Sequence, residues 1–409
     1  MPEIEIRSAT PEEAEAYRFI NSTVFAYRPE GEPFTPGETT ICAFEDGEMV
    51  SSFNAWPFEW MLNGARVAAA GVADVGTLPH RRRRGHVRRL LEESLRRQRA
   101  AGQAFAILWG THTAIYRRFG YEVVTQNVHY QMRPGDVDFA ALPGGAAPEA
   151  TGQVQLSGQP DMETLRTVYD AWIADRTGEL HRSQPMWERG PLRDRSREGR
   201  LYAAIYEEAG APSGYALYTV RDGVYGPTTE DLHPDESQRL TLRELVALSP
   251  AAYEALWRVV GSHDLVRWIH YDNAPEDDPL FDLVQEPRML RRATQDGIMA
   301  RVVDVAAGLP QRPYGGPLSL RLRVIDPLCA WNDGVWAMET DGAQTTVARS
   351  DGAAELTLPV QSLATLVTGY RSAAALVGMG RAEASAGLDL AAVDRAFATR
   401  HRPHCFHHF

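Results

Sequence analysis

The most conspicuous absence in this sequence is lysine, because all 42 positions counted as lysine or arginine are arginine. We interpret this absence first as coding bias towards arginine. The three cysteines, Cys42, Cys329 and Cys405, are few, odd in number and scattered, which argues against a disulfide framework and suits a reducing compartment. No run approaches the roughly 20 apolar residues of a membrane span. The N-terminus lacks the basic and apolar regions of a signal peptide, so we expect a cytoplasmic protein.

The charge balance limits the class of partner. The net charge of −12 over 409 residues argues against a nucleic-acid partner, although one arginine cluster stands out locally. A cationic substrate fits this acidic balance better than a polyanion does. The length exceeds one ordinary core, and the hydrophobic fraction of 44% is that of a globular protein, so we expect two or three domains.

Two common nucleotide-binding motifs are absent from the stretch 71–124. No Gly-Lys-Ser/Thr follows its basic turn, which excludes a Walker loop, and it has no Gly-x-Gly-x-x-Gly. The hydrophobic pattern predicts instead an alternation of strands and helices. In order, it predicts a strand at 67–75, an arginine-rich turn at 81–85, an amphipathic helix at 86–100, a strand at 104–109 and a short helix from Thr111 to Gly120.

A strand, a basic glycine turn and a helix together form a phosphate-binding arrangement. The first turn of a helix has unpaired N–H groups and the positive end of the helix dipole, which suit a pyrophosphate. Gly85 lets the backbone approach such a ligand closely. Positive charge and further donors come from Arg82, Arg83, Arg84 and Arg88.

Two motifs in this stretch carry a family resemblance. Arg82-x-x-Gly85-x-Val87 is similar to the acyl-CoA pyrophosphate loop of GNAT N-acetyltransferases, although Val87 replaces the usual small residue. Ile115-Tyr116-x-x-Phe119-Gly120-Tyr121 resembles the short helix that bears the tyrosine acid of that superfamily. With Pro79-His80-Arg81 before the loop, the wider string resembles the Eis (enhanced intracellular survival) family. Its members are bacterial acetyltransferases acting on amines, including aminoglycosides.

The resemblance implies a site for acetyl-CoA as co-substrate. Tyr116 would be the general acid, and the backbone N–H of Val75 would bind the thioester carbonyl. The cofactor residues implied are Val75, Gly76, Thr77, Arg82, Arg83, Arg84, Gly85, His86, Val87, Arg88, Thr111 and His112. The C-terminal carboxylate of Phe409 would be the base. The ordinary pKa of this carboxyl, about 3.5, lies about 4.5 units below that of an amine. The carboxylate would therefore act as a base only if burial raises its pKa, or it would relay the proton through water.

The resemblance implies an α+β or α/β fold with two tandem GNAT domains, each a mixed twisted sheet with flanking helices, and a sterol-carrier-like domain. The predicted boundaries are 1–135 for the catalytic domain, 136–295 for a degenerate GNAT domain and 296–409 for the last domain, whose C-terminus reaches the active site. The Gly-, Pro- and Ala-rich segment 134–160 predicts a linker or a loose connection between strands. Further strands are expected at 4–7, 40–44, 49–53, 56–60, 201–207, 213–220, 265–270, 318–324, 335–339 and 356–360, with helices at 162–174 and from Ser249-Pro250.

Several alternatives stay open on the sequence alone. The alternating Trp56, Phe58 and Trp60 fit either a sheet core or the wall of an acceptor pocket. The histidine-rich end, HRPHCFHHF, fits no closed metal-site spacing, so we expect no metal. A protein or peptide acetyltransferase and a non-catalytic acyl-CoA or lipid-binding module are the competing functions, and avoidance of self-acetylation is a second explanation for the missing lysines. The resemblance implies a homohexamer.

Overall fold

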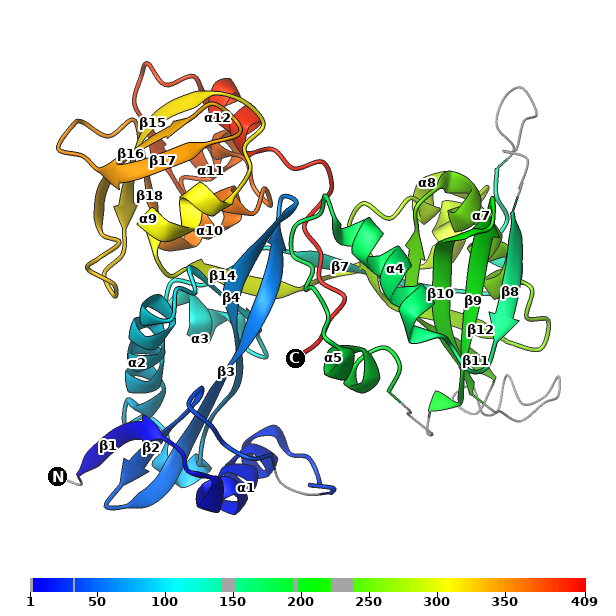
Figure 1. Ribbon diagram of the computed structural model, residues 1–409, viewed down its shortest axis with the longest axis horizontal. Helices are drawn as coiled ribbons and strands as arrows, with labels where there is room; N and C mark the ends of the chain where they lie inside the picture. Colours follow the sequence, from blue (N-terminus) through cyan, green and yellow to red (C-terminus); the bar gives the residue numbers. More distant parts are fainter. Residues whose placement is uncertain (1–2, 32–33, 141–151, 194–197, 222–237) are drawn as a thin grey trace. The chain divides into compact units, whose positions relative to one another are not determined.

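The computed structural model describes residues 3–31, 34–140, 152–193, 198–221 and 238–409. They form two compact units (Figure 1). The first unit comprises Met1–Val124, Ile298–Thr399 and Phe409, and the second comprises Thr125–Gly297 and Arg400–His408. Each unit holds a seven-stranded sheet, and the first unit also holds a five-stranded sheet. The expected α+β architecture, with mixed sheets and flanking helices, is confirmed.

The first sheet of unit one has the strand order β1-β2-β3-β4-β5-β14-β6. Its strands are β1 (Ile4–Ser8), β2 (Thr40–Glu45), β3 (Glu48–Leu62), β4 (Ala65–Thr77), β5 (Phe105–Trp109), β14 (Ile298–Val302) and β6 (Glu122–Val123). The helices of this region are η1 (Pro11–Glu13), α1 (Ala14–Phe25), η2 (Pro79–Arg81), α2 (His86–Ala100) and α3 (Thr113–Arg117).

The two faces of this sheet are covered by different helices. Side chains alternate along β2, so Ile41 and Ala43 belong to the cluster that packs on α2, whereas Cys42 and Phe44 pack with Tyr17 of α1. Figure 1 shows α1 and α2 on opposite sides of β3 and β4. Each of these β2 residues can therefore be assigned to the face that packs on α1 or to the face that packs on α2.

The hairpin of β3 and β4 is longer than the sequence indicates. The two strands predicted at 49–53 and 56–60 are one strand, because β3 continues through Asn54 without a turn, opposite a bulge in β4. The Asn63-Gly64 turn at its tip is confirmed, with φ values of 51° and 87° that match the left-handed conformations of a tight hairpin turn.

The first sheet depends on a strand from much later in the chain. β14 lies between β5 and β6, and all of its residues, Ile298–Val302, are buried. β7 (Gln126–Met132) follows β6 directly in the sequence but belongs to the sheet of the second unit. The position 135 that we expected as a boundary thus follows a strand of the second sheet.

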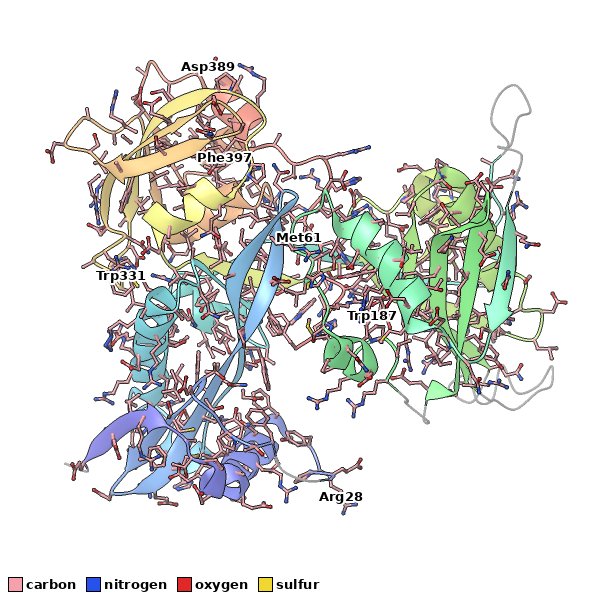
Figure 2. The ribbon with its side chains drawn as sticks, in the orientation of Figure 1. Arg28, Met61, Trp187, Trp331, Asp389 and Phe397 are labelled. Carbon is pink, nitrogen blue, oxygen red and sulfur yellow. The ribbon has the colours of Figure 1, made fainter. Side chains whose placement is uncertain are left out.

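The sterol-carrier-like part of unit one is built on a five-stranded sheet of order β17-β16-β15-β18-β19. Its elements are α9 (Val305–Gly308), η7 (Leu309–Gln311), β15 (Leu318–Ile325), β16 (Gly334–Thr340), β17 (Thr345–Arg349), β18 (Leu356–Pro359), α10 (Val360–Val367), α11 (Ala373–Gly378), β19 (Glu383–Ala384) and α12 (Leu390–Phe397). Trp331, labelled in Figure 2, donates its indole N–H to Val303 O at 2.8 Å, and its ring centroid lies 5.1 Å from the Arg99 guanidinium of α2. These contacts join this part to the first sheet.

The second unit repeats the strand and helix order, with the sheet order β13-β7-β12-β11-β10-β9-β8. Besides β7, its elements are η3 (Pro134–Asp136), β8 (Gln153–Ser157), α4 (Met162–Ile173), α5 (Gln184–Arg189), β9 (Arg200–Glu208), β10 (Ala211–Arg221), β11 (Arg239–Ala247), α7 (Pro250–Gly261), β12 (Trp268–Pro275), α8 (Leu280–Leu283), η6 (Pro287–Leu290) and β13 (Ala293–Asp296). The strand expected at 265–270 begins later than predicted. The expected linker contains β8, an edge strand paired with β9, and its residues 141–151 lie outside the described part.

Candidate active site

Two neighbouring parallel strands separate at the centre of the first sheet. β4 and β5 pair from Ala69 and Phe105 as far as Val72 and Leu108, and β4 then continues to Thr77 with no strand of the described residues paired to its β5-facing edge. A parallel sheet that opens in this way leaves backbone N–H and C=O groups free for a ligand. Val75, Gly76 and Thr77 lie in this unpaired section and line a cavity.

The loop between β4 and α2 supplies the second wall of this cavity. Gly85 is the N-cap of α2 with φ 84°, a left-handed conformation that a residue with a side chain rarely adopts. A Cβ added at Gly85 would meet only Arg89 Nη1, at 3.6 Å, so the backbone conformation rather than crowding favours glycine here. The N-cap Gly85 and the first-turn residues His86, Val87 and Arg88 line the cavity. The N–H groups of a helix's first turn have no partner within the helix, as an anion site requires.

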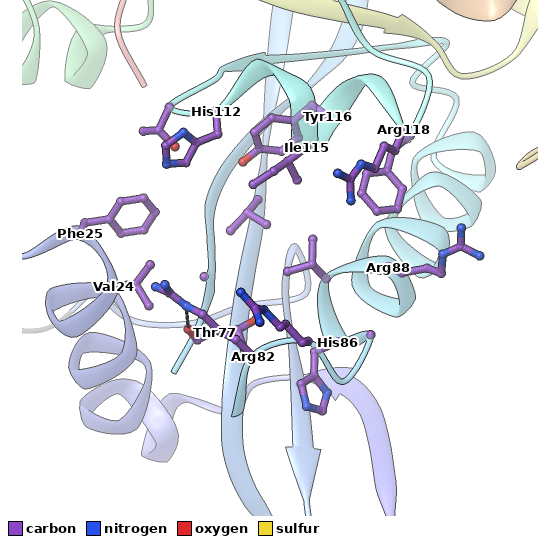
Figure 3. A pocket seen from close by; sticks show the side chains of 17 residues that line it. Val24, Phe25, Thr77, Arg82, His86, Arg88, His112, Ile115, Tyr116 and Arg118 are labelled. Carbon is purple, nitrogen blue, oxygen red and sulfur yellow. Dashed lines mark hydrogen bonds between the residues drawn. The ribbon is translucent and has the colours of Figure 1, made fainter. Parts of the chain in front are cut away.

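The cavity has a volume of about 750 Å³ and brings together nearly all of the predicted cofactor residues (Figure 3). Arg84 is the exception among them. The lining residues are Val24, Phe25, Val75, Gly76, Thr77, Arg82, Arg83, Gly85, His86, Val87, Arg88, Thr111, His112, Ile115, Tyr116, Arg118 and Phe119. The size suits an elongated cofactor arm. Ile115, Arg118 and Phe119 also line the cavity and were not among the predicted cofactor residues, although all three lie within or beside the tyrosine motif.

Arg84 and His86 point away from the cavity because a buried carboxylate holds them. Glu45 is 2% exposed and accepts hydrogen bonds from Arg81 at 2.8 Å and from Arg84 at 2.9 Å, while His86 Nε2 lies 3.0 Å from its other oxygen. Burial lowers the pKa of His86. Figure 3 shows the His86 ring turned away from the cavity. These two side chains thus shape the loop, and its positive charge at the cavity comes from Arg82, Arg83 and Arg88.

Tyr116 lies on the side of the cavity away from the arginine loop (Figure 3). It sits on α3, its side chain is 9% exposed, and its ring makes a T-shaped contact with Tyr121 at 6.2 Å. Burial raises the pKa of Tyr116 to about 12. The hydroxyl makes no hydrogen bond within the described residues and points into the cavity, so it can donate a proton to a ligand there.

The short helix α3 is held by a residue that no sequence motif singles out. Arg301 of β14 is fully buried and donates to the carbonyl of Phe119, to Asp326 at 2.6 Å and to Cys329 Sγ at 3.0 Å. The end of α3 can approach this guanidinium because residue 120 is glycine. A Cβ added at Gly120 would lie 1.6 Å from Arg301 Nη1. No local pattern predicts this contact, which joins residues 182 positions apart.

The last residue of the chain, Phe409, also lies in the first unit. Its ring contacts Phe58 of β3 edge-on, with centroids 4.9 Å apart, and faces Gly71 of β4. In the second unit the residues before it are anchored, since His404 Nδ1 lies 2.7 Å from Glu179 and the N–H of Phe406 donates to the same carboxylate. Within the described residues no group of three or more His, Cys, Asp or Glu side chains is placed to hold a metal.

The aromatic row of β3 divides between the two roles that we considered. Trp60 is fully buried and packs on Phe105 at 5.6 Å, so it belongs to the core. Trp56 and Phe58 are half-buried on the face that holds α1, where Trp56 contacts Phe34 and Phe58 contacts Phe409. These two rings line the same face as the C-terminal residue.

Comparisons with known protein families match most of the chain. Residues 5–124 and, separately, residues 178–302 match families described as acetyltransferase (GNAT) domain. Residues 305–406 match a sterol carrier protein domain. In the part of the chain that the structure describes, no helix is both long and apolar enough to cross a membrane.

Similar proteins cover nearly the whole chain. An uncharacterized N-acetyltransferase of Streptomyces avermitilis is 29% identical over 85% of this chain and 83% of its own length. N-acetyltransferase Eis of Mycobacterium tuberculosis is 28% identical over 81% of this chain and 78% of its own. Among solved structures, Eis1 from Mycobacterium abscessus has a TM-score of 0.81 and 25% identity over 99% of this chain and all of its own. A GCN5-related N-acetyltransferase from Anabaena variabilis shares the fold, with a TM-score of 0.85 and 21% identity over the full length of both chains.

Proposed function

We propose that this chain, which is similar to N-acetyltransferase Eis and has two segments that match GNAT acetyltransferase domains, transfers the acetyl group of acetyl-CoA to an amine of a cationic small molecule, such as an aminoglycoside. One observation carries this proposal. The cavity of the first unit has the arginine loop on one side and the Tyr116 hydroxyl on the other, with the open edge of β4 between them. Phosphate binding, carbonyl binding and proton donation can therefore occur on one elongated ligand.

The arginine loop would hold the pyrophosphate of acetyl-CoA. Arg82 and Arg83 form no ion pair within the described residues, so their charge is available to a phosphate. The backbone N–H groups at the start of α2 would add hydrogen-bond donors for the same pyrophosphate. Gly76 and Thr77 would pair through their backbone with the pantetheine arm, and the arm would pass along β4 towards Val75.

Val75 and Tyr116 would act on the thioester itself. The N–H of Val75 stabilises the negative charge that develops on the carbonyl oxygen as the amine nitrogen attacks the carbon. The carbon–sulfur bond then breaks, and Tyr116 donates its phenolic proton to the departing thiolate. A neutral, desolvated phenol suits this role, because its burial keeps it protonated until the thiolate forms.

The carboxylate of Phe409 would take the proton that the amine loses, directly or through a water molecule. Its ring is fixed against Phe58, which limits where the carboxylate can lie. The same negative charge would attract a cationic acceptor. We further propose, from the resemblance alone, that the protein assembles as a hexamer, which light scattering of the purified chain would test.

A thiol-release assay tests the proposed function. The purified protein is incubated with acetyl-CoA and a panel of amines, namely an aminoglycoside, a diamine, a monoamine and a lysine-containing peptide, and free CoA thiol is followed with time. We expect acetyl-CoA-dependent release with the cationic small molecules. Release with the peptide alone would assign the protein to peptide acetylation, and release with none of them would refute the proposal, provided that calorimetry shows acetyl-CoA binding.

A further inference from the structure

β4 carries one irregular residue where it leaves β5. Between Ala73 and Gly76 it has one residue more than β3 has between Asn54 and Ser52, which is a β-bulge. Asp74 occupies this bulge with φ 56°, an uncommon value for a residue other than glycine. Ser52 Oγ stabilises it by donating to Asp74 O at 2.8 Å. The bulge turns the Asp74 side chain towards α1.

The Asp74 carboxylate is half-buried, and few neighbouring groups compensate its negative charge. Its side chain accepts one hydrogen bond, from the buried hydroxyl of Tyr17 at 2.8 Å, and within the described residues no arginine or histidine pairs with it. Burial raises its pKa above the usual aspartate range. The other titratable groups near it are Cys42 and Tyr27, which are neutral at pH 7. A cationic ligand would supply the missing partner.

Aromatic rings lie on the same face of the sheet as this carboxylate. The Tyr17 ring lies 5.8 Å from that of Phe34, and Phe34 meets Trp56 edge-on at 5.2 Å. Phe34 is 39% exposed and Trp56 is half-buried, so a ligand can reach them. Aromatic faces attract ammonium groups, and a carboxylate next to them adds direction.

The position of Asp74 along β4 relates it to the reacting atoms. It directly precedes Val75, which lines the acetyl-CoA cavity, so the two Cα atoms lie about 3.8 Å apart. In the other direction the ring of Phe409 faces Gly71, three residues earlier and thus roughly 10 Å away along the strand. An acceptor amine delivered to the thioester would lie beside Asp74.

From this placement we propose that Asp74, together with the Tyr17 hydroxyl and the rings of Phe34 and Trp56, binds a protonated amine of the acceptor. This inference rests on the proposed function. The bound amine is not the one acetylated, because the attacking nitrogen must be neutral. The preferred acceptor therefore carries at least two amines, one held as an ammonium group by Asp74 and another presented to the thioester.

The test compares Asp74→Asn with a matched control, using 1,4-diaminobutane and butylamine as acceptors. Asparagine keeps the shape and tolerates the left-handed backbone. Asp46→Asn makes the same substitution at another left-handed aspartate, φ 50°, in the exposed turn between β2 and β3. We expect Asp74→Asn to raise the KM for 1,4-diaminobutane about 10- to 100-fold, with kcat nearly unchanged. Asp46→Asn should leave both constants at the wild-type values.

Butylamine separates recognition from a structural role. It lacks the second ammonium group, so its kcat/KM should be the same in wild type and Asp74→Asn, with an unchanged unfolding temperature and acetyl-CoA affinity. Equal losses with both amines would overturn the proposal, and so would an unchanged KM for the diamine. Calorimetric titration of the CoA-loaded protein with 1,4-diaminobutane keeps the test independent of turnover. Binding of equal strength in wild type and Asp74→Asn, or no binding in wild type, would refute the subsite even where acetyl transfer proceeds.

Discussion

The substitution Tyr116→Phe removes the hydroxyl that would donate the proton and keeps the ring that packs. The ring packs on Tyr121 and is 9% exposed, so phenylalanine keeps that contact. The hydroxyl has no hydrogen-bond partner in the described residues, so its removal leaves no buried group unsatisfied and should cost less than about 1 kcal/mol of unfolding free energy. The loss of a general acid should lower kcat by roughly 10²–10⁴-fold, which corresponds to about 3–5 kcal/mol of barrier.

The raised pKa of Tyr116 makes a second prediction from the same site. At about 12, it exceeds that of a free thiol near 8.5 by about 3.5 units, or roughly 5 kcal/mol, so the proton should move only as the carbon–sulfur bond breaks. Burial also raises the pKa of the departing thiol, so the difference between the two pKa values is smaller within the site. Tyr116 can donate only while its phenol is protonated, and it stays protonated at any pH well below its raised pKa. Its ionisation should therefore cause no loss of kcat between about pH 7 and 10.

Both statements can be measured by thiol release at saturating substrates. Wild type and Tyr116→Phe are compared across that pH range, with thermal unfolding as the control for folding. A kcat within threefold of wild type would assign Tyr116 to packing. A decline in wild-type kcat centred near pH 10 that Tyr116→Phe lacks would show that the phenol ionises normally, and would refute the argument from burial.

Three further predictions concern the loop, the buried arginine and the chain end. Gly85→Glu adds backbone strain and a negative charge at the phosphate position, so calorimetry should show severe loss of acetyl-CoA affinity, and an unchanged affinity would exclude this loop. Arg301→Met should lower the free energy of urea unfolding by about 3–5 kcal/mol, because it leaves the buried Asp326 carboxylate without its cation; a loss below about 1 kcal/mol contradicts this. Extending Phe409 with a few glycine and serine residues should lower kcat and raise the acceptor KM while acetyl-CoA binding persists, and normal turnover would place the base elsewhere.

Local patterns predicted much of the catalytic region because they depend on neighbouring residues. The helix expected at 86–100 is α2, since its apolar periodicity and the glycine before it are both local signals. The tight turn at Asn63-Gly64 follows from residues that adopt positive φ. Most predicted cofactor residues meet in one cavity for the same reason, because they come from one continuous stretch.

The features that the sequence does not reveal are those that distant residues decide. Arg84 belongs to the arginine cluster by sequence, yet Glu45, 39 residues earlier, holds its side chain away from the cavity. Asp74 looks like a polar interruption in an apolar strand, and only pairing with β3 reveals the bulge. Arg301 is one of many arginines in the sequence, and its contact with Phe119 depends on a strand that returns after the second sheet is complete.

That returning strand makes a last prediction about which segment can fold alone. A fragment ending at residue 135, the boundary expected from the sequence, would lack β14, which pairs with β5 on one side and β6 on the other. β5 would become an edge strand, and α3 would lose the Arg301 bond that holds its end. The fragment would also expose Val128, Tyr130 and Met132 of β7, all of which are buried in the second sheet. We therefore expect it to aggregate or to bind no acetyl-CoA by calorimetry. Cooperative unfolding together with full-length affinity for acetyl-CoA would show that β14 is dispensable to the site.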